Sequence, residues 1–596
     1  MEHAMLSGTD LKDGDAFDVV VVGAGASGMT AALVALQEGQ KVLLIEASAQ
    51  VGGTSARSAG TLWVPGNRFE KKATDSSGQT SLESARMYLD ASIGDRSPAR
   101  LRERFLNAGP ELVEYLLRHS HTRFKACPRH SDYYPWLEGS REGYRAIEPE
   151  VFDARQLGPA FSLLRPPLKE FMVFGGMMVS KADIDLLLKA GKNRAGTWHA
   201  IKLASRYLKD RLRYPRGTRL TMGNALTGSL LCSLLSRKAL ILLNTTVVHA
   251  SALGAGEHRL LVRTPEGERT LVCRKGLILA GGGFSANRQW RERYLPSPAP
   301  THTATSGLSN ATTLELGLAL GGVMGKPQGD NAWWFPSSIA SRADGSTIVY
   351  PHILMDRGKP GVWAVDSSGK RFVNEGLCYH EFSRAQYAAA AIPCWLICDA
   401  RALRRYGMGL IRPGAHSARK WIREGYLKTA ADITSLAAVI GVPPGQLVKS
   451  VSRMNDIARC GHDDQFGRGE DHLSRQNGDA SHGPSPSLGP ISSPPFYAIR
   501  LEPADLGTAI GLEADEHARL LNAHGDAIAG VYVCGNDMNS IMGGQYPAPG
   551  VTLGPGMTFA YIAAMHCATQ RTVSANHLPS GPDVPTQNTD SPASIL

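Results

Sequence analysis

The sequence predicts an α/β fold in which a Rossmann-like domain is assembled from both ends of the chain and an α+β domain is inserted between them. A strand-length apolar run, "FDVVVV" at 17–22, leads through a glycine-rich turn into a helical pattern. A later strand ends in a second glycine turn at 276–287, and a third strand with polar residues at its end lies at 530–537. Pieces of one sheet at both ends of 596 residues imply an insertion in the middle.

The domain boundaries follow from this arrangement. We expect the first part of the Rossmann-like domain at 17–334, the inserted domain at 335–496, the second part at 497–569 and a disordered tail at 570–596. The inserted domain ends in a Gly-, Ser- and Pro-rich stretch, 469–495, which predicts a long surface loop. An insertion of this size can cap a ligand that the first domain holds.

The composition excludes several classes of protein. With 43% hydrophobic and 20% charged residues it is that of an ordinary soluble globular protein, and no apolar run reaches the roughly 18 residues that span a bilayer. The first sixteen residues carry acids and no apolar core, unlike a secretory signal. The nine cysteines form no C-x-x-C pair, which predicts free buried thiols and no metal site. We therefore expect a cytoplasmic protein.

The net charge of +10 is concentrated in residues 189–219, which hold ten Lys or Arg against one acid, Asp210. No nucleic-acid-reading motif accompanies these charges, so we expect no nucleic-acid partner. Two interpretations stay open. The stretch is either a solvated helix face with snorkelling side chains, or a peripheral contact with an anionic membrane from which an apolar substrate is drawn.

The first glycine turn has the spacing of a dinucleotide site. Gly23, Gly25 and Gly28 give G-x-G-x-x-G, where the first glycine allows the tight turn, the second allows close approach of a pyrophosphate and the third allows helix to pack on strand. Ala26 and Ser27 then open the helix, whose positive end binds phosphate. A second strand, 41–47, carries Glu46, an acceptor for ribose hydroxyls that disfavours a 2′-phosphate and hence NADP.

The next stretch, "SAQVGGTSARSAGTLWVPGN" at 48–67, favours a flavin over NAD, because it presents backbone with few side chains in the way. It resembles the flavoprotein superfamily of fumarate reductase and the ketosteroid dehydrogenases, in which this segment covers FAD. The resemblance implies FAD contacts at Gly52, Gly53, Thr54, Ser55, Ser58, Ala59 and Gly60.

Two later segments agree with an FAD site. "GLILAGGGFSAN" at 276–287 supplies Gly281 and Gly282, and "GVYVCGND" at 530–537 supplies Asn536 and Asp537 for the ribityl and phosphate region. No histidine beside the glycine motifs matches the covalent pattern, so we expect non-covalent FAD. Further expected FAD contacts are Val247, Val551 and Leu553.

The inserted domain carries a candidate for chemistry. In "GVWAVDSSGKRFVNEGLCYHEFSRA", residues 361–385, a strand and a turn precede R-F-V-N-E, which in the superfamily leads a substrate-facing segment onto the flavin. The next polar ring is Tyr379. His380 is an alternative, although neighbouring side chains usually point apart.

A second tyrosine lies in "GGQYPAPGVTLGPGMTF", residues 543–559. After Tyr546, prolines fix the backbone and Gly550 leaves an unshielded N–H. The segment reads as the entry to a helix whose positive N-terminus would favour an anionic reduced flavin. Tyr546 and the Gly550 amide can therefore converge on one oxygen and polarise a ketone.

This last segment is similar to the 3-ketosteroid Δ1-dehydrogenase family, and so is 131–159, with its D-Y-Y-P and F-D-A-x-x-L-G. The resemblance covers most of residues 17–567, and fumarate reductases lack the tyrosine–proline–glycine segment. One departure lies at 506–525, where Ala509 and Ile510 replace the family's usual residues near the substrate end of the site.

The resemblance implies a 3-ketosteroid substrate and a double bond introduced between carbons 1 and 2. It implies that Tyr379 is the base, that Tyr546 and the Gly550 amide clamp the carbonyl, and that Tyr133, in preference to Tyr134, supports Tyr379. A tyrosine has an ordinary pKa of about 10, so it acts as a base only where a neighbouring donor or positive potential stabilises its phenolate. Hydride leaves to flavin N5 on the opposite face of the substrate.

Other functions stay open at this point. A steroid 4,5-desaturase shares the chemistry, and a fumarate-reductase-like enzyme would reduce an unsaturated acid but would require arginine and histidine clamps. A flavin-binding electron carrier would leave the tyrosines unexplained. The electron acceptor is not identified by the sequence; a quinone or an artificial dye would serve.

Overall fold

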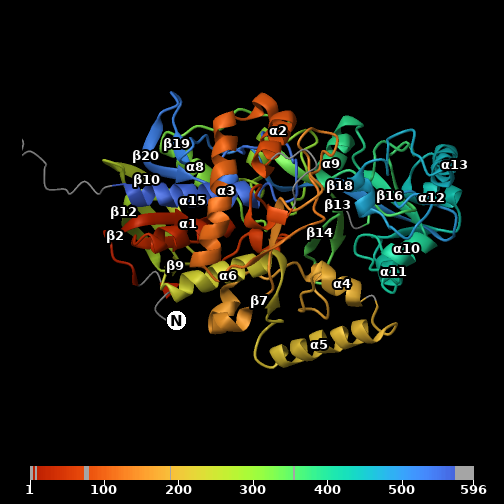
Figure 1. The fold of residues 1–596 in the computed structure, drawn as a ribbon, viewed down its shortest axis with the longest axis horizontal. Coiled ribbons are helices and arrows are strands. Elements are labelled where there is room, and N and C mark those ends of the chain that lie inside the picture. Colours follow the sequence, from red (N-terminus) through yellow and green to blue (C-terminus); the bar gives the residue numbers. More distant parts are fainter. Residues whose placement is uncertain (1–4, 7–9, 73–79, 188, 354–355, 571–596) are drawn as a thin grey trace, which may run out of the picture.

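The structure, a computed structural model, describes residues 5–6, 10–72, 80–187, 189–353 and 356–570. Apart from Gln570, the predicted tail lies outside the described residues. Figure 1 shows two lobes side by side, one around a large sheet that contains both early and late segments, and one formed by the middle of the chain.

The first sheet has nine strands in the order β1-β9-β3-β2-β12-β11-β10, with β20 pairing with β12 and β19 with β20. Its strands are β1 (Met5–Leu6), β2 (Asp15–Val22), β3 (Val42–Ile45), β9 (Leu240–Leu242), β10 (Thr246–Gly254), β11 (Glu257–Thr264), β12 (Gly267–Leu279), β19 (Arg519–Leu521) and β20 (Ala527–Val533). The predicted strands at 17–22, 276–287 and 530–537 are thus β2, β12 and β20, and β12 runs parallel to both of the others.

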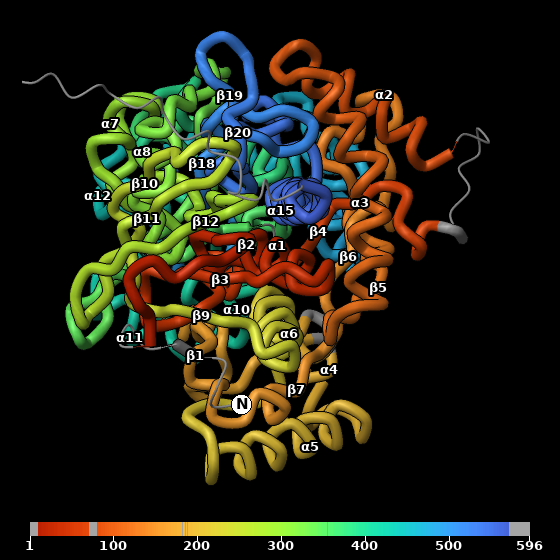
Figure 2. Tube along the Cα trace, turned by 90° about the vertical axis from the view of Figure 1, so that its left-hand side faces the viewer, coloured from red at the N-terminus to blue at the C-terminus, as the bar shows by residue number. Residues whose placement is uncertain are grey.

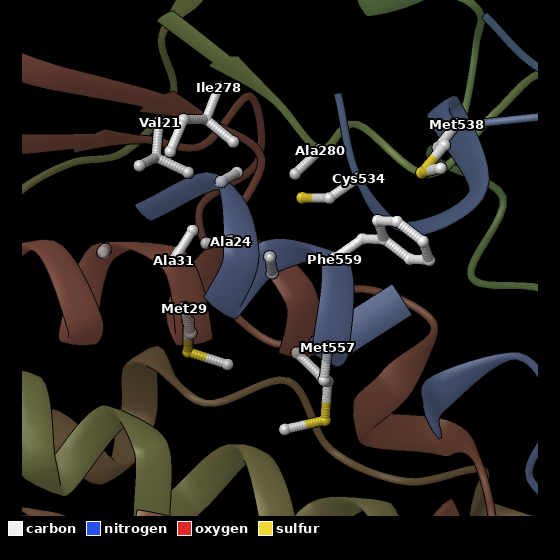
Figure 3. Packing of buried hydrophobic residues seen from close by; sticks show 14 of the residues in the cluster. Val21, Ala24, Met29, Ala31, Ile278, Ala280, Cys534, Met538, Met557 and Phe559 are labelled. Carbon is white, nitrogen blue, oxygen red and sulfur yellow. The ribbon is translucent and has the colours of Figure 1, made fainter. Parts of the chain in front are cut away.

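The interior of this sheet explains why "FDVVVV" is continuously apolar. β2 lies between β3 and β12, and Val19, Val20 and Val21 are fully buried. Strands covered on both faces lose the polar alternation of surface strands. Figure 3 shows α1 and α15 packed together through small side chains and methionines, beneath Val21 and Ile278 of the sheet.

Helices flank this sheet. They are α1 (Ala26–Gln37), α2 (Ser81–Ile93), α3 (Ala99–His119), α6 (Met222–Ser236), α7 (Arg288–Tyr294), α8 (Thr312–Ala319) and α15 (Leu553–Thr569). Gly23, between β2 and α1, has φ +108°, and a Cβ there would lie 2.3 Å from the carbonyl oxygen of Ala280. The turn of β2 and the turn after β12 therefore meet only because residue 23 has no side chain.

The second sheet has six strands in the order β14-β13-β18-β16-β15, with β17 beside β18. Its strands are β13 (Ala332–Ser341), β14 (Thr347–Pro351), β15 (Val362–Val365), β16 (Cys394–Asp399), β17 (Lys428–Ala430) and β18 (Phe496–Thr508). β18 extends well past the predicted boundary at residue 496. Its buried Asp505 pairs with Arg291 of α7, which joins the two lobes.

The helices of the second lobe are α9 (Tyr379–Ala388), α10 (Ala400–Tyr406), α11 (Ala418–Arg423), α12 (Ile433–Ile440), α13 (Pro444–Cys460) and α14 (His472–Asn477). After α14, the stretch 469–495 has no helix or strand, as predicted for a loop or linker, but it is not confined to the surface. It contains α14, and Leu488 and Ile491 are buried against α12 and α13. The high content of Gly, Ser and Pro breaks regular structure there, but the apolar residues between them still pack.

Residues 120–220, together with residues 62–63, form a third, smaller layer. Its elements are β4 (Leu62–Trp63), β5 (Phe124–Ala126), β6 (Ala146–Pro149), β7 (Phe152–Asp153), β8 (Arg219–Leu220), α4 (Lys181–Leu187) and α5 (Arg194–Arg211). Figures 1 and 2 both show α5 at the outer edge of the molecule, below α6 and β7. In the part of the chain that the structure describes, no helix has the length and apolar character needed to cross a membrane.

The cysteines are free, as predicted. Eight of the nine are buried, and Cys460 at the end of α13 is exposed. Among the described residues, no group of three or more His, Cys, Asp or Glu side chains could hold a metal ion.

Candidate functional site

A cavity of about 1090 Å³ lies where the two lobes meet. Residues that follow the carboxyl ends of β2, β3, β12 and β20 line one part, and residues of β13, β14 and β18 line another. The predicted residues on its wall are Gly23, Gly25, Ala26, Ser27, Glu46, Gly53, Thr54, Ser55, Ser58, Ala59, Gly60, Tyr133, Val247, Gly281, Gly282, Tyr379, Asn536, Tyr546, Gly550 and Leu553. Segments separated by hundreds of residues thus converge on one space.

Four predicted cofactor residues, Gly28, Gly52, Asp537 and Val551, do not line the cavity. The fully buried Asp537 carboxylate accepts hydrogen bonds from the backbone N–H groups of Gly281 (2.5 Å) and Gly283 (2.7 Å). It therefore fixes the glycine turn after β12 instead of facing the cavity. Gly28 allows α1 to pack on its own turn, since a Cβ there would lie 1.8 Å from the carbonyl oxygen of Gly23.

The nucleotide end of the cavity has a wall of bare backbone. A Cβ added to Gly53 would lie 3.7 Å from the Cα of Gly25, so these two glycines face each other with no side chain between them. Gly25 is also the N-cap of α1, whose first amide, that of Ala26, donates to the Ser55 hydroxyl at 3.2 Å. A helix N-terminus beside bare backbone fits the pyrophosphate of a dinucleotide.

Glu46 follows β3 at this end. Its Oε2 accepts from the Ala24 N–H at 2.9 Å, and its Oε1 accepts from the N–H and hydroxyl of Ser48. These bonds fix the carboxylate at the cavity wall. Oε2 still has a lone pair, so it can accept from a ribose hydroxyl.

The loop 304–313, whose last two residues begin α8, also lines the nucleotide end, and no sequence motif predicted it. The Thr54 hydroxyl lies 3.1 Å from both the hydroxyl and the N–H of Ser306, which holds the loop against the segment 53–60. The loop has no strand or helix pattern of its own. Only the small residues in "ATSGLSNATT" could have indicated that backbone approaches a ligand there.

The other end of the cavity holds three tyrosines. The ring centroids of Tyr133, Tyr379 and Tyr546 are 5.2 to 6.0 Å apart, and the hydroxyl oxygens of Tyr133 and Tyr379 are 3.4 Å apart. Phe335 of β13 packs on Tyr379 with a centroid distance of 4.3 Å. Apolar side chains at this end include Ile353, Leu473, Leu506 and Met178, and Ser131, Gln476 and Asn477 also line the cavity.

Tyr133 is positioned by the chain around Tyr546. The Tyr133 N–H donates to the carbonyl oxygen of Pro547 at 2.7 Å, and the Tyr88 hydroxyl donates to the same oxygen at 2.6 Å. The preceding Asp132 is buried and paired with Arg145. Tyr134 points elsewhere: its hydroxyl donates to Glu381 at 2.9 Å and does not line the cavity.

Tyr379 is the first residue of α9, and a buried arginine network holds the segment before it. Arg357 donates to the carbonyl oxygens of Glu375 (2.9 Å) and Leu377 (3.2 Å). The Glu375 carboxylate is buried between Arg371 and Arg468. Burial alone would raise the pKa of Glu375, but the two guanidinium groups lower it below its ordinary value, so the carboxylate stays charged.

Gly550 has φ +96°, and a Cβ there would lie 2.7 Å from the Thr61 carbonyl oxygen and the Trp63 amide nitrogen. This close approach to β4 requires glycine. Within the described part of the chain, the Gly550 N–H donates to no other group. Gly550 and Tyr546 therefore both present donors at the same end of the cavity.

Burial sets the protonation of the three phenols. It raises the pKa of Tyr379 and of Tyr133 well above the ordinary value, and the neighbouring tyrosines raise that of Tyr379 further. Burial raises the pKa of Tyr546 to about 12. At neutral pH all three are neutral hydroxyls that can donate.

His380 does not line the cavity, although its ring lies beside that of Tyr546, with a centroid distance of 6.0 Å. Its Nδ1 accepts from the Trp334 N–H at 3.2 Å, and it is fully buried. Burial lowers the pKa of His380 to about 3, so the ring is neutral. Ala509 and Ile510, the departure noted at 506–525, are buried and do not line the cavity, whereas Leu506 does.

Comparisons with known proteins agree with an FAD site. Residues 18–553 match the family described as FAD binding domain. The chain is 35% identical over 581 residues to a 3-oxosteroid 1-dehydrogenase of Mycolicibacterium smegmatis, covering 94% of this chain and 99% of the relative. It is 33% identical to a 4-oxocyclohex-2-ene-1-carboxylate 5-dehydrogenase of Sinomonas cyclohexanicum, covering 95% and 96%.

A solved structure is similar throughout. The 3-ketosteroid delta1-dehydrogenase of Sterolibacterium denitrificans, solved in complex with 1,4-androstadiene-3,17-dione, superimposes with a TM-score of 0.85 and 33% sequence identity. The match covers 93% of this chain and 99% of that one.

Proposed function

The chain belongs to the 3-ketosteroid Δ1-dehydrogenase family of FAD-dependent oxidoreductases, and from this premise we propose that it introduces the carbon 1–carbon 2 double bond into a 3-ketosteroid. The observation that carries this proposal is the convergence of Tyr133, Tyr379 and Tyr546 at one end of the cavity. Carboxylate-clamping enzymes require cations at this position, and a 3-ketone requires neutral donors.

FAD, which we expect to be held non-covalently, would supply a two-electron oxidant for the substrate. The residues that would hold it are those of the glycine turns, the segment 53–60 and Glu46. These residues and residues of the second lobe line the same cavity.

In the proposed reaction, the Tyr546 hydroxyl and the Gly550 N–H donate to the carbonyl oxygen at carbon 3. This stabilises the negative charge that develops on the oxygen and makes a carbon 2 hydrogen acidic. Tyr379, in its deprotonated form, accepts that proton, and the Tyr133 hydroxyl, 3.4 Å away, donates to the Tyr379 oxygen. Carbon 2 thus loses a proton and carbon 1 a hydride, which leaves the double bond. A quinone, or a dye in the laboratory, would then take the electrons.

An anaerobic titration of the purified yellow protein with androst-4-ene-3,17-dione tests the proposal. We expect the flavin absorbance to bleach and the product to lack one hydrogen at each of carbons 1 and 2, by mass and NMR. Loss of hydrogens from carbons 4 and 5 of a saturated ketosteroid would instead identify a 4,5-desaturase.

The titration also includes two other small molecules. Bleaching by 4-oxocyclohexanecarboxylate and not by the steroid would replace the steroid with a monocyclic ketone. Oxidation of the reduced protein by fumarate, without bleaching by either ketone, would place the enzyme with the reductases. A flavin reduced by none of these compounds would support an electron carrier.

A further inference from the structure

Tyr134, the second tyrosine of D-Y-Y-P, lies between α9 and the segment that carries Tyr546. It is buried and does not line the cavity. Its hydroxyl donates to Glu381 Oε1 at 2.9 Å and accepts from the Tyr546 N–H at 3.3 Å. Glu381 follows Tyr379 by two residues on α9. One hydroxyl group therefore joins the helix of the proposed base to the backbone of the proposed carbonyl clamp.

Arg384, one turn beyond Glu381 on α9, holds the acceptor that Tyr134 uses. Its Nη1 donates to Glu381 Oε1 at 3.0 Å and to Gln545 Oε1 at 3.3 Å, and its Nε lies 3.1 Å from Asp330 Oδ2. Gln545 Oε1 also lies 3.4 Å from the Tyr134 hydroxyl. The guanidinium group therefore fixes the Glu381 carboxylate and the Gln545 side chain together.

The backbone of residues 544–546 is also held from the second lobe. The Trp333 indole N–H donates to the Gln545 carbonyl oxygen at 3.2 Å. Gly544 has φ +76°, and a Cβ there would lie 2.2 Å from the Asp330 carbonyl oxygen, so the two chains touch through bare backbone. These contacts fix the segment up to the residue before the clamp tyrosine, and the second phenol of D-Y-Y-P holds the clamp residue itself.

We propose that Tyr134 is a positioning residue, which sets the place of the Tyr546 hydroxyl relative to Tyr379. This inference rests on the proposed function, in which those two tyrosines act on neighbouring atoms, the oxygen at carbon 3 and a hydrogen at carbon 2. A donor stabilises a developing oxyanion only at hydrogen-bond distance from it, and a displacement of about 1 Å can lower a rate by about 10²-fold. The bonds of Tyr134 therefore affect the rate, although its side chain does not reach the substrate.

The alternative is that Tyr134 only fills space. Its ring lies 5.7 Å from that of Trp136 by centroid distance, a packing contact that Tyr134→Phe keeps. The same substitution removes the bond to Glu381 and leaves the Tyr546 N–H without the hydroxyl that accepts it. Tyr134→Phe therefore separates positioning from packing.

Stopped-flow reduction of the holoenzyme by androst-4-ene-3,17-dione measures the effect. We expect Tyr134→Phe to keep FAD and the full bleaching amplitude, and to lower the rate constant at saturating steroid by about 10-fold or more. The deuterium isotope effect from carbon 2 should exceed that of the parent, because a displaced clamp makes that hydrogen less acidic and its transfer slower. Loss of packing alone would lower the FAD content or the amplitude, and the remaining holoenzyme would keep the parent rate and isotope effect.

Two further variants complete the series. Tyr115→Phe is the matched control, because the Tyr115 hydroxyl donates to Glu38 at 2.8 Å, a tyrosine–carboxylate bond outside the cavity, and it should be reduced at the parent rate. Glu381→Leu removes the acceptor and keeps Tyr134, so it should slow reduction in the same way, and it carries the test if Tyr134→Phe does not fold. A parent-like rate or isotope effect in the variant that folds, or an equal loss in Tyr115→Phe, would overturn the proposal.

Equilenin, a steroid with a phenolic hydroxyl at carbon 3, gives a readout without turnover. Its fluorescence differs between the neutral and the ionised hydroxyl, and well-placed donors favour the ionised form. We expect a smaller ionised fraction on Tyr134→Phe than on the parent at the same pH. If this difference is found but the ketosteroid does not bleach the parent, the proposed function is wrong and the positioning of Tyr546 stands. Bleaching of the parent with equal ionised fractions would keep the function and overturn the positioning.

Discussion

Tyr379 and Tyr387 stand on the same helix, α9, and differ in what their hydroxyl groups meet. Tyr379 faces the cavity beside Tyr133, whereas the Tyr387 hydroxyl lies 3.4 Å from the carbonyl oxygen of Pro298, outside the cavity. The same substitution, tyrosine to phenylalanine, therefore tests the proposed base at Tyr379 and serves as a control at Tyr387.

The substitution Tyr379→Phe should keep FAD bound and lower the rate of flavin reduction by a ketosteroid by about 10²- to 10⁴-fold, because a proton acceptor is removed without a change of shape. Stopped-flow absorbance measures the rate. The Tyr387→Phe protein should reduce its flavin at nearly the parent rate. Parent-like reduction in the Tyr379→Phe protein would rule out this residue as the base.

The same reaction should depend on pH in a defined direction. Burial raises the pKa of Tyr379 well above the ordinary value, so its phenolate fraction increases with pH throughout the range in which the protein is handled. The rate of flavin reduction should rise with pH without a plateau below about pH 10. Tyr546, with a pKa of about 12, stays a donor over that range. A bell-shaped profile centred near neutrality would contradict this assignment and favour a histidine.

At the scale of elements, one carboxylate connects the segment after β20 to the glycine turn after β12. Asp537, just past the end of β20, accepts the N–H groups of Gly281 and Gly283, although burial raises its pKa. Gly281 and Gly282 line the cavity, and Asp537 does not. The cavity wall at this turn therefore depends on a residue behind it.

The substitution Asp537→Asn should therefore destabilise the holoprotein by about 1.5–3 kcal/mol and increase FAD loss, because an amide NH₂ cannot accept from a backbone N–H. Thermal unfolding and the FAD content after gel filtration measure both effects. Asp526→Asn, at an exposed turn, is the control and should change neither. Unchanged FAD retention in the Asp537→Asn protein would show that the turn holds its shape without this carboxylate.

The elements differ in how far the sequence predicts them. β2, α1, β3 and β20 were predictable because each combines an apolar run with a glycine turn, and both signals are local. The sequence does not predict that the loop 304–313 and Met178 line the cavity. Their position there depends on contacts with distant segments, which no local pattern marks. The composition of 469–495 correctly indicates irregular structure after α14, but it does not show that Leu488 and Ile491 pack in the core.

The same limit applies within the candidate site. The segments around Tyr379 and Tyr546 could be identified by family resemblance, but the spacing of D-Y-Y-P alone does not distinguish Tyr133 from Tyr134. In the structure the Tyr133 hydroxyl lies 3.4 Å from that of Tyr379 at the cavity, while the Tyr134 hydroxyl donates to Glu381 away from it. Likewise, the basic content of 189–219 was visible in the sequence, but the exposure of Trp198 and Leu212 depends on which face of α5 packs.

At the scale of the whole molecule, buried phenols are spread through both lobes. Tyr88, Tyr133, Tyr134, Tyr379 and Tyr426 are each buried, and burial raises the pKa of each above the ordinary value. In the unfolded chain these groups release protons near pH 10, while in the folded protein they keep them. Above that pH the unfolded state binds fewer protons, so stability falls as pH rises.

We therefore expect the free energy of unfolding to be constant with respect to these groups below about pH 9 and to fall above about pH 10, by about 1.4 kcal/mol per pH unit for each group. Denaturant titrations at a series of alkaline pH values measure the slope. A slope near zero between about pH 10 and 11 would mean that the phenols ionise in the folded state without cost.

The connectivity of the first sheet has a consequence for how the protein is made. β12 stands between β2, from the start of the chain, and β20, from near its end. The first sheet can therefore be completed only after the ribosome has synthesised β20 and α15. Until then, while the second lobe is being synthesised, the early strands have an unpaired edge. Pairings of such long sequence separation form slowly and expose aggregation-prone edges. Yield in a heterologous host should thus depend on chaperone capacity and flavin supply late in synthesis, and a chain stopped before residue 527 has no route to a complete first lobe.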